Sequence, residues 1–222
     1  MKTQMSGEHQ VSNSSQEEGL PYPQNIVLVG ALQSIILDIE ARDYQLTLEQ
    51  EAAIAEVGHA LLDGRTSGYI EMATSTGKTA LEAIITEAAV KSGKRVLMLA
   101  PKVGIARQLS GKNQETSSGL ARFTHAHQNA RVGHHFGTSR SRQSDDIVIA
   151  TYSGFLNASK NDFAQMGNFD VIIADECHRG LGEQTSRALV ESFPDAVKLG
   201  FSATPDYAID RTSEEVFGDR LF

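Results

Sequence analysis

Short apolar runs without polar alternation restrict most strongly how this chain of 222 residues can fold. The runs are "GYIEMA" (68–73), "RVLMLA" (95–100), "DDIVIA" (145–150), "FDVIIAD" (169–175) and "AVKLGFSA" (196–203). Strands that are apolar on both faces are typical of parallel sheets, because helices cover both faces of such a sheet. Helical patterns such as "TALEAIITEAAVKSG" (79–93) alternate with the runs. The alternation predicts an α/β fold with a mostly parallel sheet between two layers of helices.

The N-terminal part of the chain has a different composition. Residues 1–25 are polar and rich in Ser, Gln and Glu, which predicts a disordered leader. Residues 26–44 are predicted to form an accessory helix docked on the domain, with a partner-binding helix as the alternative. Apolar residues recur there at helical spacing: Leu28, Leu32, Ile35, Ile36 and Ile39. Residues 45–222 then form the globular lobe, whose first helix begins after Thr47 as N-cap.

Cysteine usage and apolar run length indicate the compartment. The single cysteine, Cys177, excludes an internal disulfide and favours a reducing environment. The N-terminus is not of signal-peptide type, and the longest apolar run (26–39) is interrupted by Gln33 and Ser34 and too short to span a bilayer. We therefore expect a cytoplasmic protein, or a nuclear one in a eukaryote, without a membrane partner.

The net charge of −8 is unevenly distributed. Residues 88–143 hold 10 basic residues and one acidic residue, a balance of +9, whereas the segments before and after them carry −9 and −8. A basic block can form an anion-binding face even in an acidic protein, and a solvated charged surface is the alternative.

Polar signatures follow three of the predicted strands: "TSTGKT" (74–79), "DECH" (175–178) and "SATP" (202–205). Ligands bind at the carboxyl ends of strands in sheets of this kind. The first signature fits a P-loop, in which Lys78 meets the β/γ-phosphates and Thr79 meets Mg²⁺, although Met72 occupies the first glycine slot of G-x-x-x-x-G-K-[ST]. Asp175 is predicted to hold Mg²⁺ through its bound water, and Glu176 to polarise an attacking water.

Five segments, in this order and spacing, resemble motifs I, Ia, Ib/Ic, II and III of superfamily-two helicases and translocases: "MATSTGKT", "VLMLAPK", "IVIATYSGF", "VIIADECHRG" and "LGFSATP". The resemblance covers residues 42–222. The DECH spelling, "SATP" and "EEVFGDRLF" (214–222) are most similar to the branch that includes restriction-enzyme motor subunits (ResIII-like). The implied fold is a three-layer P-loop (RecA-like) sandwich, the first of two motor lobes, here with a helical N-terminal extension.

The resemblance implies a site for ATP and Mg²⁺. The residues implied to bind the nucleotide phosphates are Thr74, Ser75, Thr76, Gly77, Lys78, Thr79 and Ala80. Gln50 is implied to recognise adenine, with Gln45 as the alternative. Lys78, Asp175 and Glu176 are the implied catalytic residues, and Thr79 and Asp175 the implied metal ligands.

The resemblance also implies nucleic acid, DNA rather than RNA, as a partner. His178, Ser202 and Thr204 would couple the nucleotide site to it. The implied contacts, together with Arg107 of the basic block, are Pro101, Lys102, Thr151, Tyr152 and Ser153.

Two departures from the family pattern matter. Ser75 stands where glycine is most frequent, and serine would add strain if the position needs a positive φ. No motif IV, V or VI follows, so the family's arginine finger and half of its nucleic-acid track would come from a second lobe, in cis or in trans.

The implied function is the ATP-binding first motor lobe of a nucleic-acid-dependent ATPase, which hydrolyses ATP to ADP and phosphate when a second lobe completes it. A nucleotide-responsive module that binds nucleic acid or a partner, with little hydrolysis of its own, is the alternative. A stand-alone P-loop kinase is disfavoured, because it would explain neither "SATP" nor the basic block.

Two other readings of single residues are disfavoured. A metal site is disfavoured at four histidines, because no cysteine or acidic residue accompanies them and the stretch is predicted to be irregular and polar. These histidines are His125, His127, His134 and His135. Cys177 follows two carboxylates, which would raise the pKa of its thiol and weaken it as a nucleophile.

Overall fold

Six strands form one sheet in the computed structural model, which describes residues 23–40, 45–73, 75–110, 130–161, 166–180, 182–203 and 216–222. The order across the sheet is β1-β6-β5-β2-β4-β3, and every pair of neighbours is parallel. The strands are β1 (Ser67–Glu71), β2 (Val96–Ala100), β3 (Val132–His135), β4 (Ile147–Thr151), β5 (Val171–Ala174) and β6 (Val197–Ser202). The predicted parallel α/β sheet is confirmed.

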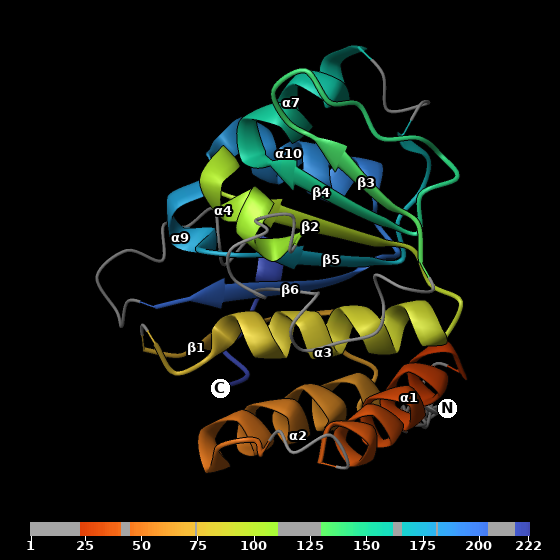
Figure 1. The fold of residues 1–222 in the computed structure, drawn as a ribbon, viewed down its shortest axis with the longest axis vertical. Coiled ribbons are helices and arrows are strands. Elements are labelled where there is room, and N and C mark those ends of the chain that lie inside the picture. The colour runs from red at the N-terminus through yellow and green to blue at the C-terminus, as the bar shows by residue number, and fades with distance from the viewer. Residues whose placement is uncertain are drawn as a thin grey trace, which may run out of the picture.

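Helices cover both faces of the sheet, as Figure 1 shows. One face is covered by α2 (Leu48–Leu62), α3 (Lys78–Lys91) and α4 (Val103–Leu109), and α1 (Pro23–Glu40) packs against α2 and α3 on the same side. The other face packs against α7 (Tyr152–Asn161), α9 (Cys177–Gly180) and α10 (Glu183–Ser192). Of these described helices, none has the length and apolar character that a membrane crossing requires.

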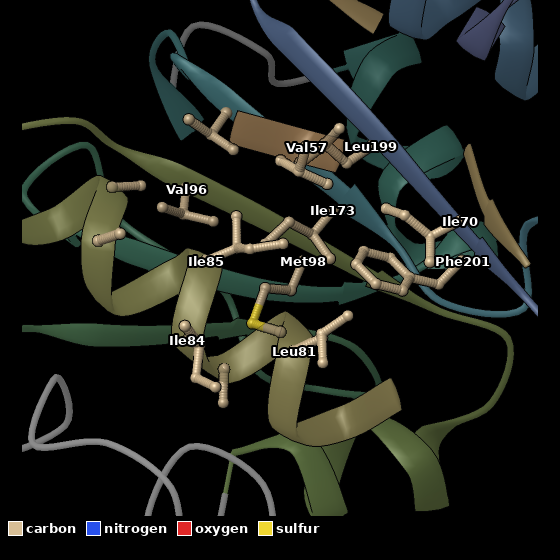
Figure 2. Close-up of a cluster of buried hydrophobic side chains, with 14 of the residues drawn as sticks. Val57, Ile70, Leu81, Ile84, Ile85, Val96, Met98, Ile173, Leu199 and Phe201 are labelled. Atoms are coloured by element: carbon tan, nitrogen blue, oxygen red, sulfur yellow. The ribbon is translucent and has the colours of Figure 1, made fainter. Parts of the chain in front are cut away.

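The two cores use alternate residues of the same strands. Val96 and Met98 of β2 belong to the cluster under α3, whereas Leu97 and Leu99 belong to the cluster under α7. Every residue of β2, β4 and β5 is buried, which explains why their sequences are apolar without alternation. Figure 2 shows the first cluster, in which side chains of α3 lie against those of the strands.

The N-terminal helix α1 is part of the packed structure. Leu28, Leu32 and Ile35 are buried, and α1 contacts both α2 and α3. Asn25 Nδ2 donates a hydrogen bond to Leu61 O (3.0 Å), and Lys91 Nζ lies 3.0 Å from Asp38 Oδ2. The predicted helical extension is therefore present, and it begins three residues earlier than predicted. Residues 1–22 of the predicted leader and residues 41–44 lie outside the described residues.

Helix α2 begins where the sequence predicts. Thr47 is its N-cap, and the Thr47 hydroxyl accepts a hydrogen bond from the Gln50 N–H (3.2 Å). The Gln50 side chain in turn accepts one from the Thr47 N–H (3.0 Å), which completes a capping box.

The edge strand β3 was not predicted. His134 and His135 lie in it, rather than in an irregular stretch, and β3 pairs with β4 from Val132↔Ile147 to His135↔Ala150. The sequence of β3, "VGHH", contains one apolar side chain and so carries no periodic signal. His125 and His127 lie outside the described residues.

The opposite edge strand, β1, is covered by the end of the chain. Tyr69 N–H donates to Asp219 O (3.2 Å), and Leu221 N–H donates to Tyr69 O (2.8 Å). Arg220 also lies 3.0 Å from a carboxylate oxygen of Glu71. The two backbone hydrogen bonds satisfy groups of Tyr69 that an edge strand would otherwise expose.

Candidate functional site

The loops after β1, β5 and β6 meet at the carboxyl ends of these strands, because the three strands are parallel neighbours in the order β1-β6-β5. These loops carry the three polar signatures, which lie far apart in the sequence. Thr74 of the first signature and Thr204 of the third lie outside the described residues. The remaining residues form a polar site at the carboxyl ends of the strands, where α/β proteins bind ligands.

The loop between β1 and α3 has the geometry of an anion-binding turn. Its backbone is left-handed at Ser75 (φ 72°) and Gly77 (φ 91°), and the Thr76 hydroxyl donates to Ala73 O (2.7 Å). Helix α3 begins at Lys78 without a side-chain cap. Its first N–H groups therefore point toward the loop, and the helix dipole adds partial positive charge there. Such an end of a helix binds phosphate groups.

Gln50 braces this loop from α2. Its side chain is buried, and Nε2 donates to Thr76 O (3.1 Å). A Cβ atom at Gly77 would overlap the same Nε2 atom and displace the Gln50 amide from the loop, and the positive φ of Gly77 itself favours glycine. Gln45, in contrast, is exposed and precedes the helix. The structure thus places Gln50, not Gln45, against the loop.

A chain of polar contacts connects the three loops. Lys78 Nζ lies 3.2 Å from Glu176 Oε1 and 3.5 Å from Met72 O. Glu176 Oε2 lies 3.5 Å from His178 Nε2. The opposite ring nitrogen, His178 Nδ1, is 2.9 Å from the Ser202 hydroxyl. The contacts run from the first residue of α3, past the end of β5, to the last residue of β6.

Asp175 lies beside this chain in a buried position. Its N–H donates to Leu99 O (2.9 Å), and its carbonyl oxygen accepts from the Tyr152 hydroxyl (2.8 Å). Burial raises the pKa of the Asp175 carboxyl, and the charge of Glu176 raises it further. A bound cation would favour the ionised form of the Asp175 carboxyl. Carboxylate and hydroxyl oxygens suit Mg²⁺, and Thr79 in the first turn of α3 adds a hydroxyl, so the residues present fit this ion.

Backbone strain is concentrated at the same site. Among the described residues, Ser75 and Glu176 (φ 47°) are the non-glycine residues with positive φ. This conformation costs a non-glycine residue roughly 1–2 kcal/mol. Residues held in such conformations cluster at functional sites. Ser75, which stands where glycine is most frequent in the family, therefore has the positive φ at which serine adds strain.

Glu82 is a polar residue of this region that the motifs do not single out. It lies one turn after Lys78 on α3 and is fully buried. Its i, i+4 spacing from Lys78 is the sequence signal that identifies it, since such residues share a helix face. Cys177 is also buried, and burial raises the pKa of its thiol to about 12, so it is a poor nucleophile at neutral pH.

The basic residues predicted to contact nucleic acid lie on or before α4. Lys102 is its N-cap and is exposed, as is Arg107 in its last turn, while Pro101 is half-buried. A cavity of about 380 Å³ lies nearby, and its lining includes Thr151, Ser153 and Arg140. Arg140, which no motif contains, thus extends the basic surface toward Ser153.

Tyr152 is a correction to the predicted nucleic-acid contacts. Its side chain is buried in the core between the sheet and α7, and its hydroxyl supports Asp175. Tyr152 is the first residue of α7, and this helix start turns the ring inward, while Ser153 remains exposed. The side chain therefore belongs to the support of the acidic pair.

Sequence comparison finds relatives that match most of the chain. The pattern of the family described as "Type III restriction enzyme, res subunit" (ResIII) matches residues 43–207. The chain is 29% identical over 196 residues to the type I restriction enzyme EcoAI endonuclease subunit of Escherichia coli, across 82% of this chain and 21% of that protein. It is 28% identical over 202 residues to the probable helicase A859L of African swine fever virus, across 83% of this chain and 22% of that protein. The chain spans about a fifth of the length of these curated relatives.

Structure comparison identifies the fold. The crystal structure of the UvsW helicase from bacteriophage T4 has a TM-score of 0.61 to this chain, at 16% sequence identity. The match covers 80% of this chain and 60% of that chain. At this identity the likeness shows the fold alone. The predicted three-layer RecA-like sandwich is confirmed.

Replacing Ser75 with glycine is expected to stabilise the fold by about 0.5–1 kcal/mol. Glycine removes the cost of the left-handed conformation, and the extra backbone freedom that glycine has in the unfolded chain offsets part of that gain. Urea unfolding of Ser75→Gly measures the change. Ser139→Gly is the control, because Ser139 is exposed but lacks a positive φ, and this variant should lose stability. Equal effects in the two variants would contradict the assigned strain.

Proposed function

The chain belongs to the family of the type III restriction enzyme res subunit, and from that premise we propose that it is the ATP-binding first motor lobe of a nucleic-acid-dependent ATPase of helicase or translocase type. The observation that carries this proposal is the continuous series of side-chain contacts through Lys78, Glu176, His178 and Ser202. It joins a phosphate-type loop, an acidic pair and a third loop, as coupling of nucleotide chemistry to movement requires.

ATP is proposed to bind with its phosphates in the loop after β1, against the N-terminus of α3. Thr79 and Asp175 would hold Mg²⁺, which neutralises phosphate charge when bound. Gln50 is proposed to recognise the adenine. Because its amide already supports the loop through Thr76, base recognition and loop geometry would depend on the same side chain.

Lys78 is proposed to exchange its carboxylate partner for the β/γ-phosphates. In the structure it pairs with Glu176 at 3.2 Å, and the more highly charged phosphates offer it a stronger partner. The exchange would release Glu176 Oε1. His178, at 3.5 Å from the other oxygen, would keep the carboxylate in place.

Glu176, once released, is proposed to act as the general base. It would orient a water molecule and accept its proton as the water oxygen bonds to the γ-phosphorus. The bond between the γ-phosphorus and the bridging oxygen breaks, and ADP and phosphate leave. The change of charge at Glu176 would alter the position of His178. His178 would then shift Ser202 and Thr204, the other proposed coupling residues.

Nucleic acid is proposed to lie along α4 and the cavity beside β4. Lys102, Arg107 and Arg140 would contact phosphates, with the exposed Ser153 adding a hydroxyl group. Thr151 is buried, and its hydroxyl supports this turn by accepting a hydrogen bond from the Gly154 N–H (3.0 Å). DNA is favoured over RNA, because one relative is a restriction-enzyme subunit. Since the chain spans about a fifth of its relatives, a second RecA-like lobe in cis or in trans is proposed to complete the motor.

The polypeptide of these 222 residues is expected to bind ATP but to hydrolyse it at least about a thousandfold more slowly than a two-lobed motor. An arginine finger supplied by a second lobe is worth about 10³–10⁵ in rate. Phosphate release, measured with and without DNA, tests this. Glu176→Gln should lower the residual rate further and leave binding intact, whereas Glu183→Gln, at an exposed position on α10, should change neither. Fast, DNA-stimulated turnover would contradict the proposal that a second lobe is required.

Nucleic-acid binding is expected to be weak and to depend on salt. Each phosphate contact contributes about −0.7 to −0.9 to the slope of log affinity against log salt, so a few contacts give a shallow slope. Lys102→Glu and Arg107→Glu should flatten the slope, as measured by fluorescence anisotropy with labelled DNA. Lys94→Glu makes the same charge change just before β2, at the amino ends of the strands and so away from α4, and should leave the slope unchanged. A flat slope in the wild type would make the basic block a solvated surface.

A further inference from the structure

Tyr152 places a hydroxyl group inside the core of the protein. Its exposed fraction is 5%, and its ring belongs to the apolar cluster between the sheet and α7. Phenylalanine would fill nearly the same space, and a buried hydroxyl group is costly unless it makes a hydrogen bond. The Tyr152 hydroxyl donates to the main-chain oxygen of Asp175 (2.8 Å). This bond is what a tyrosine supplies here and a phenylalanine could not.

The start of α7 holds the hydroxyl group in place. Tyr152 directly follows β4, and the Thr151 hydroxyl accepts a hydrogen bond from the Gly154 N–H (3.0 Å). A Cβ atom at Gly154 would overlap His135 O, so the first turn of α7 lies closely against the end of β3. In the strand order β5-β2-β4, the Tyr152 side chain reaches from the end of β4 past β2 to the end of β5.

The bond restrains one peptide unit of the site. The carbonyl oxygen of Asp175 and the N–H of Glu176 belong to the same planar unit, so a bond to one fixes the orientation of both. Rotation of this unit would change φ of Glu176, which is 47°. The steric cost of a left-handed backbone favours such a rotation, and the bond from Tyr152 opposes it. The N–H of Asp175 is bonded separately, to Leu99 O (2.9 Å), so the rotation would move Glu176 and leave the Asp175 side chain in place.

The position of the Glu176 carboxylate depends on this restraint. Its two oxygens lie 3.2 Å from Lys78 Nζ and 3.5 Å from His178 Nε2. Once Lys78 exchanges Glu176 for the nucleotide phosphates, the carboxylate is oriented by His178 and by its own main chain. A general base has to stay within hydrogen-bond reach of the water whose proton it accepts, so the main-chain conformation matters most in the nucleotide complex.

We propose that Tyr152 is a positioning residue for the general base. Its hydroxyl group holds the peptide unit between Asp175 and Glu176, and it thereby keeps the Glu176 backbone left-handed and its carboxylate in one position. The inference rests on the proposed function, since it takes Glu176 as the base. Tyr152 is buried and acts through Glu176, so it is not itself a catalytic residue.

Removal of a single oxygen atom tests this role. Tyr152→Phe keeps the ring and deletes the hydroxyl group. Thr86→Val is the matched control, because the Thr86 hydroxyl is also buried and also donates to a main-chain oxygen, that of Glu82 (2.7 Å), about two turns from Lys78 along α3. The full-length variants and the wild type are compared in three measurements. These are amide hydrogen exchange at Glu176 without nucleotide, affinity for a non-hydrolysable ATP analogue in excess Mg²⁺, and the single-turnover rate of phosphate release.

The proposal expects the Glu176 amide hydrogen to exchange about tenfold faster in Tyr152→Phe than in the wild type, since one hydrogen bond no longer restrains its peptide unit. Phosphate release should slow by about 10–100-fold, because a small misplacement of a reacting group has an effect of this size. Affinity for the analogue should stay within about threefold of the wild type, since Lys78 and Asp175 keep their places.

Thr86→Val should match the wild type in all three measurements. Each variant loses one buried hydrogen bond, so a general loss of stability would affect the two alike and would not separate them. Thermal unfolding of both variants measures that shared loss.

Three results would overturn the positioning role. Wild-type exchange at Glu176 in folded Tyr152→Phe would show that the hydroxyl group does not hold this peptide unit. In the wild type, which needs no variant to fold, exchange at Glu176 as fast as in an unprotected amide would contradict the role as well. A loss of analogue affinity in Tyr152→Phe as large as its loss of rate would make Tyr152 a support of the whole nucleotide site rather than of Glu176.

Failure of the proposed function gives a different result. The folded wild type would then bind no analogue, and the positioning of a base would lose its meaning even where Tyr152→Phe speeds exchange at Glu176. Intact analogue binding together with unchanged exchange at Glu176 in Tyr152→Phe would refute the positioning role alone.

Discussion

The parallel pairing of β1, β6 and β5 is the constraint on which the site depends. Strand β6 pairs with both neighbours, from Glu71↔Ser202 on one side and Ala174↔Gly200 on the other. Along β6, Ser202 lies two residues beyond Gly200, the partner of the last paired residue of β5. This position brings Ser202 within reach of His178. A slip of one residue would turn the Ser202 side chain to the opposite face of the sheet. The contact chain from α3 to β6 is therefore a consequence of strand order and register.

The site concentrates features that oppose folding. Lys78, Asp175 and Glu82 are buried polar groups, and Ser75 and Glu176 have left-handed backbones. The apolar layers on both faces of the sheet offset these costs, since they bury the central strands completely. A rigid surrounding core can hold charged groups in an arrangement that they would not adopt alone, which is what a preorganised phosphate site requires.

Sequence patterns predict most strands, the parallel sheet and the family, because apolar runs and motifs are local signals. They do not predict what depends on packing. The strand β3 carries only one apolar residue and gives no periodic signal. Tyr152 lies within a motif expected at the surface, yet the start of α7 turns its ring into the core. Glu82 stands in an ordinary helical pattern, and only the packed structure shows that its side chain is completely buried.

The most direct test of the account is whether Lys78 carries nucleotide binding. Thermal unfolding with and without Mg·ATP compares the wild type, Lys78→Ala, and Lys91→Ala at the other end of α3. At a hundredfold excess over Kd, ATP should stabilise the wild type by about 2.7 kcal/mol. The account predicts that Lys78→Ala loses most of this stabilisation and that Lys91→Ala retains it. A folded wild type that shows no shift with Mg·ATP, or a Lys78→Ala variant that shifts as the wild type does, would contradict it.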